Sequence, residues 1–139
     1  STESLIVLNA TFQCRAGKDG KPLPLTAETI NAIYRKAAEN DPEHLVLFSA
    51  EQNVSADLIG TNAAVVIEGQ FNHIRTAFIE VDLARVPDLP ESCLASLGQS
   101  VLRIPVVHAK IFGWYDNEYG SYTNRLGDLT VYIHKSLFR

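Results

Sequence analysis

The sequence predicts an α+β fold: a mixed, largely antiparallel sheet covered by helices, with a long C-terminal helix. Two observations predict the helices. One apolar stripe of helical period follows residue 26, and a second runs to the end of the chain. A third observation sets the fold class, because the β-like segments cluster between these helices and do not alternate with them. Regular alternation would favour a doubly wound parallel sheet.

The first strand is expected at residues 5–14, which are rich in β-branched and aromatic side chains. Turn-forming residues at 17–22 end it. Thr26 is the expected N-cap of the following helix, and Glu28 lies in the first turn, where a carboxylate suits the helix dipole. The helix ends before Pro42. Its apolar stripe consists of Ile30, Ile33, Tyr34, Ala37 and Ala38.

The remaining strands are expected in the middle of the chain. Residues 45–48 and 64–67 are short apolar runs typical of buried strands, and 54–60 forms a loop between them. Residues 74–83 alternate, with the odd-numbered positions forming the more apolar face. Residues 91–97 predict one or two helical turns. Two further strands follow at 101–104 and 106–114, and Pro105 between them predicts an edge or a bend.

The last helix is expected to start near Asn117, with Glu118 in its first turn. Gly127 costs about 1 kcal/mol relative to alanine in a helix interior, so we expect it to serve close packing. Arg125 and Asp128 are three residues apart and are expected to pair on the helix surface. The apolar positions of this helix are Tyr122, Leu126, Leu129, Ile133 and Leu137.

Length and composition indicate one globular domain over residues 1–139. Hydrophobic residues make up 46% of the chain and charged residues 20%, as in ordinary soluble proteins. No run approaches the roughly 18 apolar residues of a membrane helix, so we expect no membrane partner. A net charge of −4 gives no reason to expect a nucleic-acid partner.

The cysteines and histidines do not indicate a metal site. Cys14 and Cys93 lie far apart and form no CxxC pattern, and the four histidines have no metal-ligand spacing. We therefore expect no metal ligands. Two reduced thiols in a cytoplasmic protein are the simplest interpretation of the cysteines.

The most informative segment is residues 113–120, Gly-Trp-Tyr-Asp-Asn-Glu-Tyr-Gly, followed by Asn-Arg at 124–125 and Asp-Leu at 128–129. It resembles the signature near the C-terminus of glyceraldehyde-3-phosphate dehydrogenases. Residues 5–12, 26–33 and 55–60 also resemble family segments in the same order. The resemblance covers residues 5–67 and 106–130, and it implies that the chain is the C-terminal part of the catalytic domain.

The resemblance implies a cofactor contact at Asn117, whose family counterpart hydrogen-bonds the carboxamide of the nicotinamide ring. An amide side chain has both donors and acceptors, so it can match a carboxamide and fix the orientation of the ring. The family's aromatic residue after the glycine corresponds less clearly. This chain has one extra residue, so either Tyr122 or Ser121 takes that place, and Tyr122 is the expected contact.

The residues of segment 113–120 also have a structural interpretation that does not involve a cofactor. Trp114, Tyr115 and Tyr119 near a strand–helix junction are more often core than cofactor contacts. Asn117 alone would be interpreted as an N-cap, a role compatible with ligand binding. Adjacent carboxylates usually point apart, so Asp116 and Glu118 are not expected to act as a general acid and base.

We expect no catalytic residues in this chain. The family's cysteine nucleophile, activating histidine, phosphate-binding arginine and dinucleotide-binding motif have no counterpart here. The chain alone is therefore expected to be inactive, with NAD bound mainly by a missing N-terminal domain. The absence of methionine also fits a fragment of a longer polypeptide.

The resemblance implies partners for the parent enzyme, a cytoplasmic glycolytic oxidoreductase. These are the remainder of the same polypeptide, glyceraldehyde 3-phosphate, phosphate and further subunits of a homotetramer. Erythrose-4-phosphate dehydrogenase and a non-catalytic assembly module of the same fold stay open as alternatives, as does NADP in place of NAD. Residues 61–107 are longer than the family segment, as an insertion at an oligomer interface or near the substrate would be.

Overall fold

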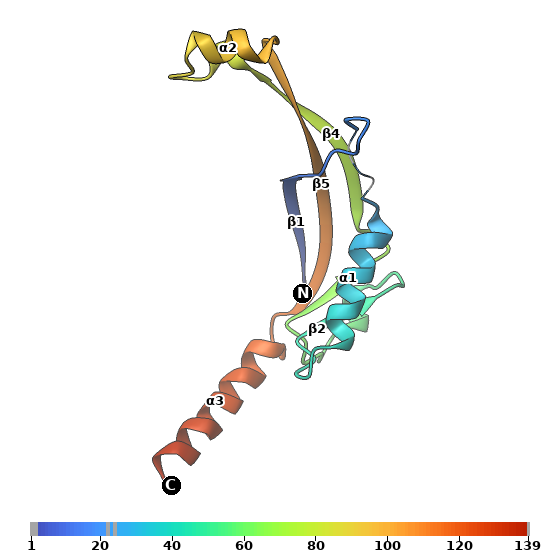
Figure 1. The fold of residues 1–139 in the computed structure, drawn as a ribbon. Helices are drawn as coiled ribbons and strands as arrows, with labels where there is room; N and C mark the ends of the chain where they lie inside the picture. Colours follow the sequence, from blue (N-terminus) through green and yellow to red (C-terminus); the bar gives the residue numbers. More distant parts are fainter. Residues whose placement is uncertain (1–2, 22, 24, 139) are drawn as a thin grey trace. The chain divides into compact units, whose positions relative to one another are not determined.

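The computed structural model describes residues 3–21, 23 and 25–138, so Pro22 of the predicted first turn lies outside it. The described residues form five strands and three α-helices, which confirms the α+β class (Figure 1). In chain order the elements are β1 (Glu3–Gln13), α1 (Ala27–Glu39), β2 (Val46–Ser49), the 3-10 helix η1 (Ser55–Asp57), β3 (Val65–Glu68), β4 (His73–Asp82), the 3-10 helix η2 (Leu83–Arg85), α2 (Glu91–Leu97), β5 (Val101–Asp116) and α3 (Ser121–Leu137).

The chain divides into two compact units. Unit 1 comprises residues 1–9, 26–73 and 110–139, and unit 2 comprises residues 10–25 and 74–109. Strands β1 and β5 therefore contribute one end to each unit. The strand order is β1-β5-β3-β2, and β4 also pairs with β5.

Unit 1 contains the mixed part of the sheet. Strand β2 is parallel to β3, and β3 is antiparallel to β5, with Val66 opposite Trp114. Leu58, Ala63 and Val66 form the buried cluster, and Leu47 and Trp114 pack against it. The segment around η1 therefore covers one side of these strands.

Helix α1 begins at the predicted N-cap: Thr26 Oγ1 accepts a hydrogen bond from Thr29 N at 3.2 Å. Glu28 lies in the first turn as expected. The predicted apolar stripe is only partly correct, because Ile33 is exposed and Asn31 is buried. The buried side is displaced because the amide of Asn31 has partners inside the unit.

Unit 2 is built around the pairing of β4 with β5. η2 begins at Asp82, whose Oδ1 accepts a hydrogen bond from Ala84 N at 3.1 Å. Its connection to β5 is fixed by a bond from Leu83 N to Ser100 O at 2.9 Å. Arg103 lies over the ring of Phe78 at 4.5 Å and pairs with Glu80 at 3.2 Å.

One prediction for this region is wrong. Residues 101–104 and 106–114 were expected as two strands, but they belong to the single strand β5. A proline removes only its own N–H from the ladder, and the Pro105 carbonyl still accepts from Cys14 N at 3.1 Å. Strand β4 is present where the sequence alternates, and its residues are exposed or at most half-buried.

The long C-terminal helix α3 is present, and Ser121 is its one buried residue. Arg125 pairs with Asp128 at 3.4 Å, as predicted, and also with Glu43 at 2.8 Å. None of the helices in the described part of the chain is long and apolar enough to cross a membrane.

Candidate functional site

The turn at residues 116–120, between β5 and α3, is organised by the buried carboxylate of Asp116. Its Oδ1 accepts hydrogen bonds from Glu118 N at 2.7 Å and Tyr119 N at 3.0 Å, and its Oδ2 accepts one from Gly60 N at 2.8 Å. These bonds, the one from Tyr119 foremost, hold the pKa of Asp116 below its ordinary value. Asp116 is therefore a charged structural anchor, with little capacity left for proton transfer.

Gly120 completes the turn and is the N-cap of α3. A Cβ at this position would clash with the carbonyl oxygen of Asp116, and backbone atoms would have to move to accommodate it. The glycine is therefore required by close approach of the backbone. Its own carbonyl accepts a hydrogen bond from Thr123 N at 3.1 Å in the first turn of the helix.

The start of α3 differs from the prediction, and Asn117 is not its N-cap. The helix begins at Ser121 because Asp116 binds the N–H groups of Glu118 and Tyr119 and so holds these residues in a turn. A side chain that bonds nearby backbone groups in this way competes with helix formation. Asn117 is consequently free of a capping role.

The half-buried side chain of Asn117 contacts the first residues of β1. Its Nδ2 donates to Ser4 Oγ at 2.9 Å, and Ser4 Oγ lies 3.2 Å from its Oδ1. One hydroxyl thus reaches both ends of the amide. The structure brings together residues 113 positions apart in the sequence at this point.

Tyr122 lies beside Asn117, as its hydroxyl donates to the backbone carbonyl of Asn117 in a short hydrogen bond. Its ring is exposed, whereas Ser121 is buried. Which of these two residues corresponds to the family's aromatic position stays a prediction. Tyr122 borders a cavity of about 270 Å³ that is also lined by Ala63, Ala64, Tyr115, Asp116 and Ser121.

Trp114 has a structural role. Its indole Nε1 donates to Glu68 Oε2 at 2.9 Å, and Asn53 Nδ2 donates to the same oxygen at 2.9 Å. Glu68 is fully buried, and its Oε1 has no hydrogen-bond partner among the described residues. Sequence reasoning missed Glu68, and the available signal was a carboxylate placed directly after a buried apolar run.

A second buried polar network was also missed. Asn31 Nδ2 donates to Gly69 O at 2.9 Å, Asn72 Nδ2 donates to Asn31 Oδ1 at 2.8 Å, and Phe112 N donates to Asn72 Oδ1 at 2.9 Å. The network joins α1, the β3–β4 turn and β5. It fixes the strand that leads into the turn at 116–120.

Glu3 is a second buried acid near this turn. Burial, and then the negative charge of Asp116, raise the pKa of Glu3 above its ordinary value. The surroundings therefore raise the pKa of Glu3 and lower the pKa of Asp116. Glu3 precedes Ser4, so the same end of β1 supplies both groups.

The remaining candidates for chemistry are the cysteines and histidines. Neither Cys14 nor Cys93 is disulfide-bonded, and both are half-buried. No group of three or more histidine, cysteine, aspartate or glutamate side chains in the described residues is arranged to hold a metal ion. His108 Nδ1 lies 2.9 Å from Thr11 Oγ1, and the His134 ring packs on Phe138 at 4.7 Å.

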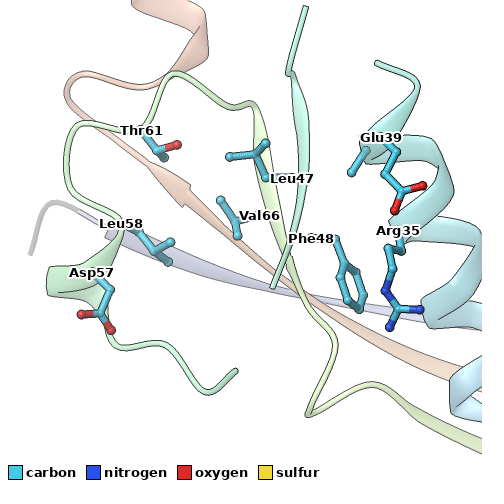
Figure 2. A pocket seen from close by; sticks show the side chains of 9 residues that line it. Arg35, Glu39, Leu47, Phe48, Asp57, Leu58, Thr61 and Val66 are labelled. Atoms are coloured by element: carbon cyan, nitrogen blue, oxygen red, sulfur yellow. The ribbon is translucent and has the colours of Figure 1, made fainter. Parts of the chain in front are cut away.

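A larger cavity of about 550 Å³ lies at the edge strand β2, between α1 and the η1 segment (Figure 2). Two of its charged side chains already have protein partners. Arg35 lies 4.9 Å from the Phe48 ring and 3.4 Å from Glu28, and Asp57 Oδ2 accepts from Val54 N at 2.8 Å. The turn at 116–120 is therefore the better candidate for ligand contact.

The chain is similar to three curated glyceraldehyde-3-phosphate dehydrogenases. It is 31% identical to glyceraldehyde-3-phosphate dehydrogenase 2 of Streptomyces avermitilis over 113 residues, which cover 81% of this chain and 25% of that protein. For the Streptomyces coelicolor enzyme the identity is 29% over 114 residues, with coverage of 81% and 25%. For glyceraldehyde-3-phosphate dehydrogenase 1 of Bacillus subtilis it is 31% over 111 residues, with coverage of 80% and 24%.

No family model matches the chain. The chain spans about a quarter of the length of the curated relatives that it matches. Each of these matches nevertheless extends over about four fifths of the chain, well beyond the turn at 116–120. The chain is therefore similar, over most of its own length, to glyceraldehyde-3-phosphate dehydrogenases.

Proposed function

We propose that the chain is the C-terminal part of the catalytic domain of an NAD-dependent phosphorylating glyceraldehyde-3-phosphate dehydrogenase, and that Asn117 positions the nicotinamide ring. The supporting observation is the half-buried amide of Asn117, held by Ser4 in a turn that Asp116 anchors. The parent enzyme would oxidise the aldehyde to an acyl phosphate through a cysteine thioester. The chain itself supplies neither that cysteine nor its base.

The amide of Asn117 retains hydrogen-bonding capacity for a ligand. It has two N–H donors and two acceptor lone pairs, and the Ser4 hydroxyl occupies at most one donor and one lone pair. The remaining N–H and lone pair match a primary carboxamide. Bound NAD would supply the hydride acceptor, and Asn117 would decide which face of the ring meets the substrate.

Tyr122 is the second proposed cofactor contact. Its exposed ring lies next to Asn117, and the bond from its hydroxyl to the Asn117 carbonyl fixes the polar end of the side chain. An aromatic face in this place supports packing against a planar nicotinamide. The proposed contribution is shape and orientation, since the hydroxyl is already engaged.

The surface of α3 supports the presence of a covering partner. Leu126 is 64% exposed, Tyr132 69% and Leu137 71%, although these are large apolar side chains on one 17-residue helix. Soluble proteins seldom leave such a contiguous apolar surface uncovered. We assign its cover to the remainder of the same polypeptide, including the dinucleotide-binding domain.

The described part of β1 supports a second kind of contact. Leu5, Ile6, Val7 and Leu8 are all 41–51% exposed, so both faces of the strand retain apolar surface. A sheet with such a strand is suited to packing against another sheet. The proposed role of this surface is subunit contact in a homo-oligomer.

The test compares Asn117→Ala with Asn40→Ala in the full-length dehydrogenase that contains these residues. The Asn40 amide only caps its own helix by donating to Lys36 O, so its variant controls for loss of an asparagine. Steady-state NADH formation is measured with glyceraldehyde 3-phosphate, phosphate and NAD. Asn117→Ala should lower kcat/KM for NAD at least about tenfold, the effect of a lost orienting contact.

Normal kinetics in a folded Asn117→Ala enzyme would contradict the proposal and leave Asn117 a structural residue. The isolated chain provides a separate check. It should form no NADH under the same conditions, because the nucleophile and most of the cofactor site lie outside it. Turnover by the chain alone that is lost in Cys93→Ala would place the chemistry here instead.

A further inference from the structure

The amide of Asn117 has one side-chain partner among the described residues, the hydroxyl of Ser4. Ser4 lies near the start of β1 and is half-buried. Its oxygen is 2.9 Å from Nδ2 and 3.2 Å from Oδ1 of the same amide. The contact therefore restrains the plane of the amide and not only the position of one atom.

We propose that Ser4 is a positioning residue, whose hydroxyl holds the Asn117 amide in the plane needed to meet the nicotinamide carboxamide. The inference rests on the proposed function of Asn117. The terminal torsion of asparagine is broad, so an amide without a partner would sample many orientations. Asp116 fixes the backbone of the turn, but it makes no bond that fixes this torsion.

The proposed role concerns specificity for the carboxamide group. A restrained amide offers its remaining N–H and lone pair in fixed directions, and a carboxamide satisfies both. An acetyl group in the same place accepts one hydrogen bond but has no N–H to donate. Ser4 should therefore favour NAD over 3-acetylpyridine adenine dinucleotide, and its loss should reduce this preference.

The test uses a pair of substitutions of equal shape in the full-length dehydrogenase, Ser4→Thr and Ser4→Val. Both suit a β-strand, and only threonine keeps the hydroxyl. The readout is kcat/KM for NAD divided by kcat/KM for the acetylpyridine analogue. Ser4→Val should lower this ratio about three- to tenfold, the effect of one neutral hydrogen bond, and Ser4→Thr should keep it near the wild-type value.

A purely structural loss would lower both rates together and leave the ratio unchanged. Thr11→Val is the matched control on β1, because the Thr11 hydroxyl contacts His108 and not Asn117. If Ser4→Val does not fold, Ser4→Ala replaces it as the variant without a hydroxyl. Thermal midpoints of all variants identify any that are unstable.

The outcomes separate Ser4 from Asn117. An unchanged ratio in the folded variant without the hydroxyl, with a lowered ratio in Asn117→Ala, overturns the role of Ser4 and leaves the proposed function standing. An unchanged ratio in Asn117→Ala removes the proposed function and the role of Ser4 with it. A ratio lowered by valine and restored by threonine supports both.

Discussion

The turn at 116–120 and helix α3 are adjacent in the sequence but differ in burial and in the number of contacts that hold them. In the turn, Asp116 is buried and accepts three backbone hydrogen bonds, and Asn117 contacts Ser4 on another strand. In α3, Ser121 is buried and the rest of the helix is half-buried or exposed. The comparison shows that the turn is held by hydrogen bonds to buried groups of the chain itself, whereas α3 buries only Ser121.

The largest expected effect is at Gly120. Gly120→Ala places a Cβ against the Asp116 carbonyl and should lower the free energy of unfolding by about 3 kcal/mol, because backbone atoms must move. Urea unfolding of the isolated chain, followed by Trp114 fluorescence, measures the change. Stability equal to wild type would mean that the turn is loosely held, and the contrast with α3 would fail.

Gly127 in α3 should respond in the opposite direction. A Cβ there meets nothing within 4 Å, so the predicted close-packing role is wrong in this chain. Gly127→Ala should raise the stability of α3 by about 1 kcal/mol, the difference in helix propensity. Circular dichroism of the isolated chain tests this. A loss of stability would show that a neighbour already covers the helix.

Substitution of Glu3 should have a smaller effect on stability, and this effect should depend on pH. Its raised pKa means that the folded state holds the proton to higher pH than the unfolded state, so ionised Glu3 lowers stability above the folded-state pKa. That penalty disappears as pH falls below the unfolded value, about 4.3. Glu3→Gln should raise the thermal midpoint at pH 7 and approach wild type near pH 4. An equal difference at both pH values would exclude this linkage.

The pKa of Asp116 is lowered, so the effect of pH on stability through Asp116 is opposite to that through Glu3. Its lowered pKa gives a contribution to stability that is present above the unfolded value, about 3.9, and is lost as pH falls through the lower folded value. The turn should therefore loosen in acid. Exchange of the Glu118 and Tyr119 amide protons, compared between pH values after correction for intrinsic rates, would show this directly.

The smallest effect is expected at Arg125, the surface link of α3. Its ion pairs with Glu43 and Asp128 involve partly exposed side chains, so Arg125→Gln should cost about 0.5 kcal/mol or less. The loss should shrink further in high salt. Thermal melts at two salt concentrations measure it. A large loss independent of salt would show that α3 is anchored more firmly than its exposure indicates.

The sequence predicted those features that depend on local patterns. The Thr26 cap, the Arg125–Asp128 pair and the order of strands and helices follow from residues a few positions apart. The start of α3 was wrong because the Asp116 carboxylate, and not helix propensity, decides the conformation of residues 118–119. The apolar stripe of α1 was displaced because Asn31 is buried by tertiary partners.

The site was predictable only in part. The motif indicated Asn117. Tyr122 and Ser121 both stay open for the family's aromatic position, although only Tyr122 has an exposed side chain. Ser4 has no local signal, because it lies 113 positions from Asn117 and meets it only when β1 reaches the end of β5. The roles of Asn117 and Tyr122 in binding a cofactor stay predictions.

The bond from Gly60 N to Asp116 has a consequence for how the family can vary. It joins two loops 56 positions apart through one carboxylate. An insertion or deletion in the segment that carries Gly60 would withdraw a hydrogen-bond donor from Asp116 and disturb the residue next to it, Asn117. Length changes in that loop should therefore be accepted only where another donor replaces the lost one.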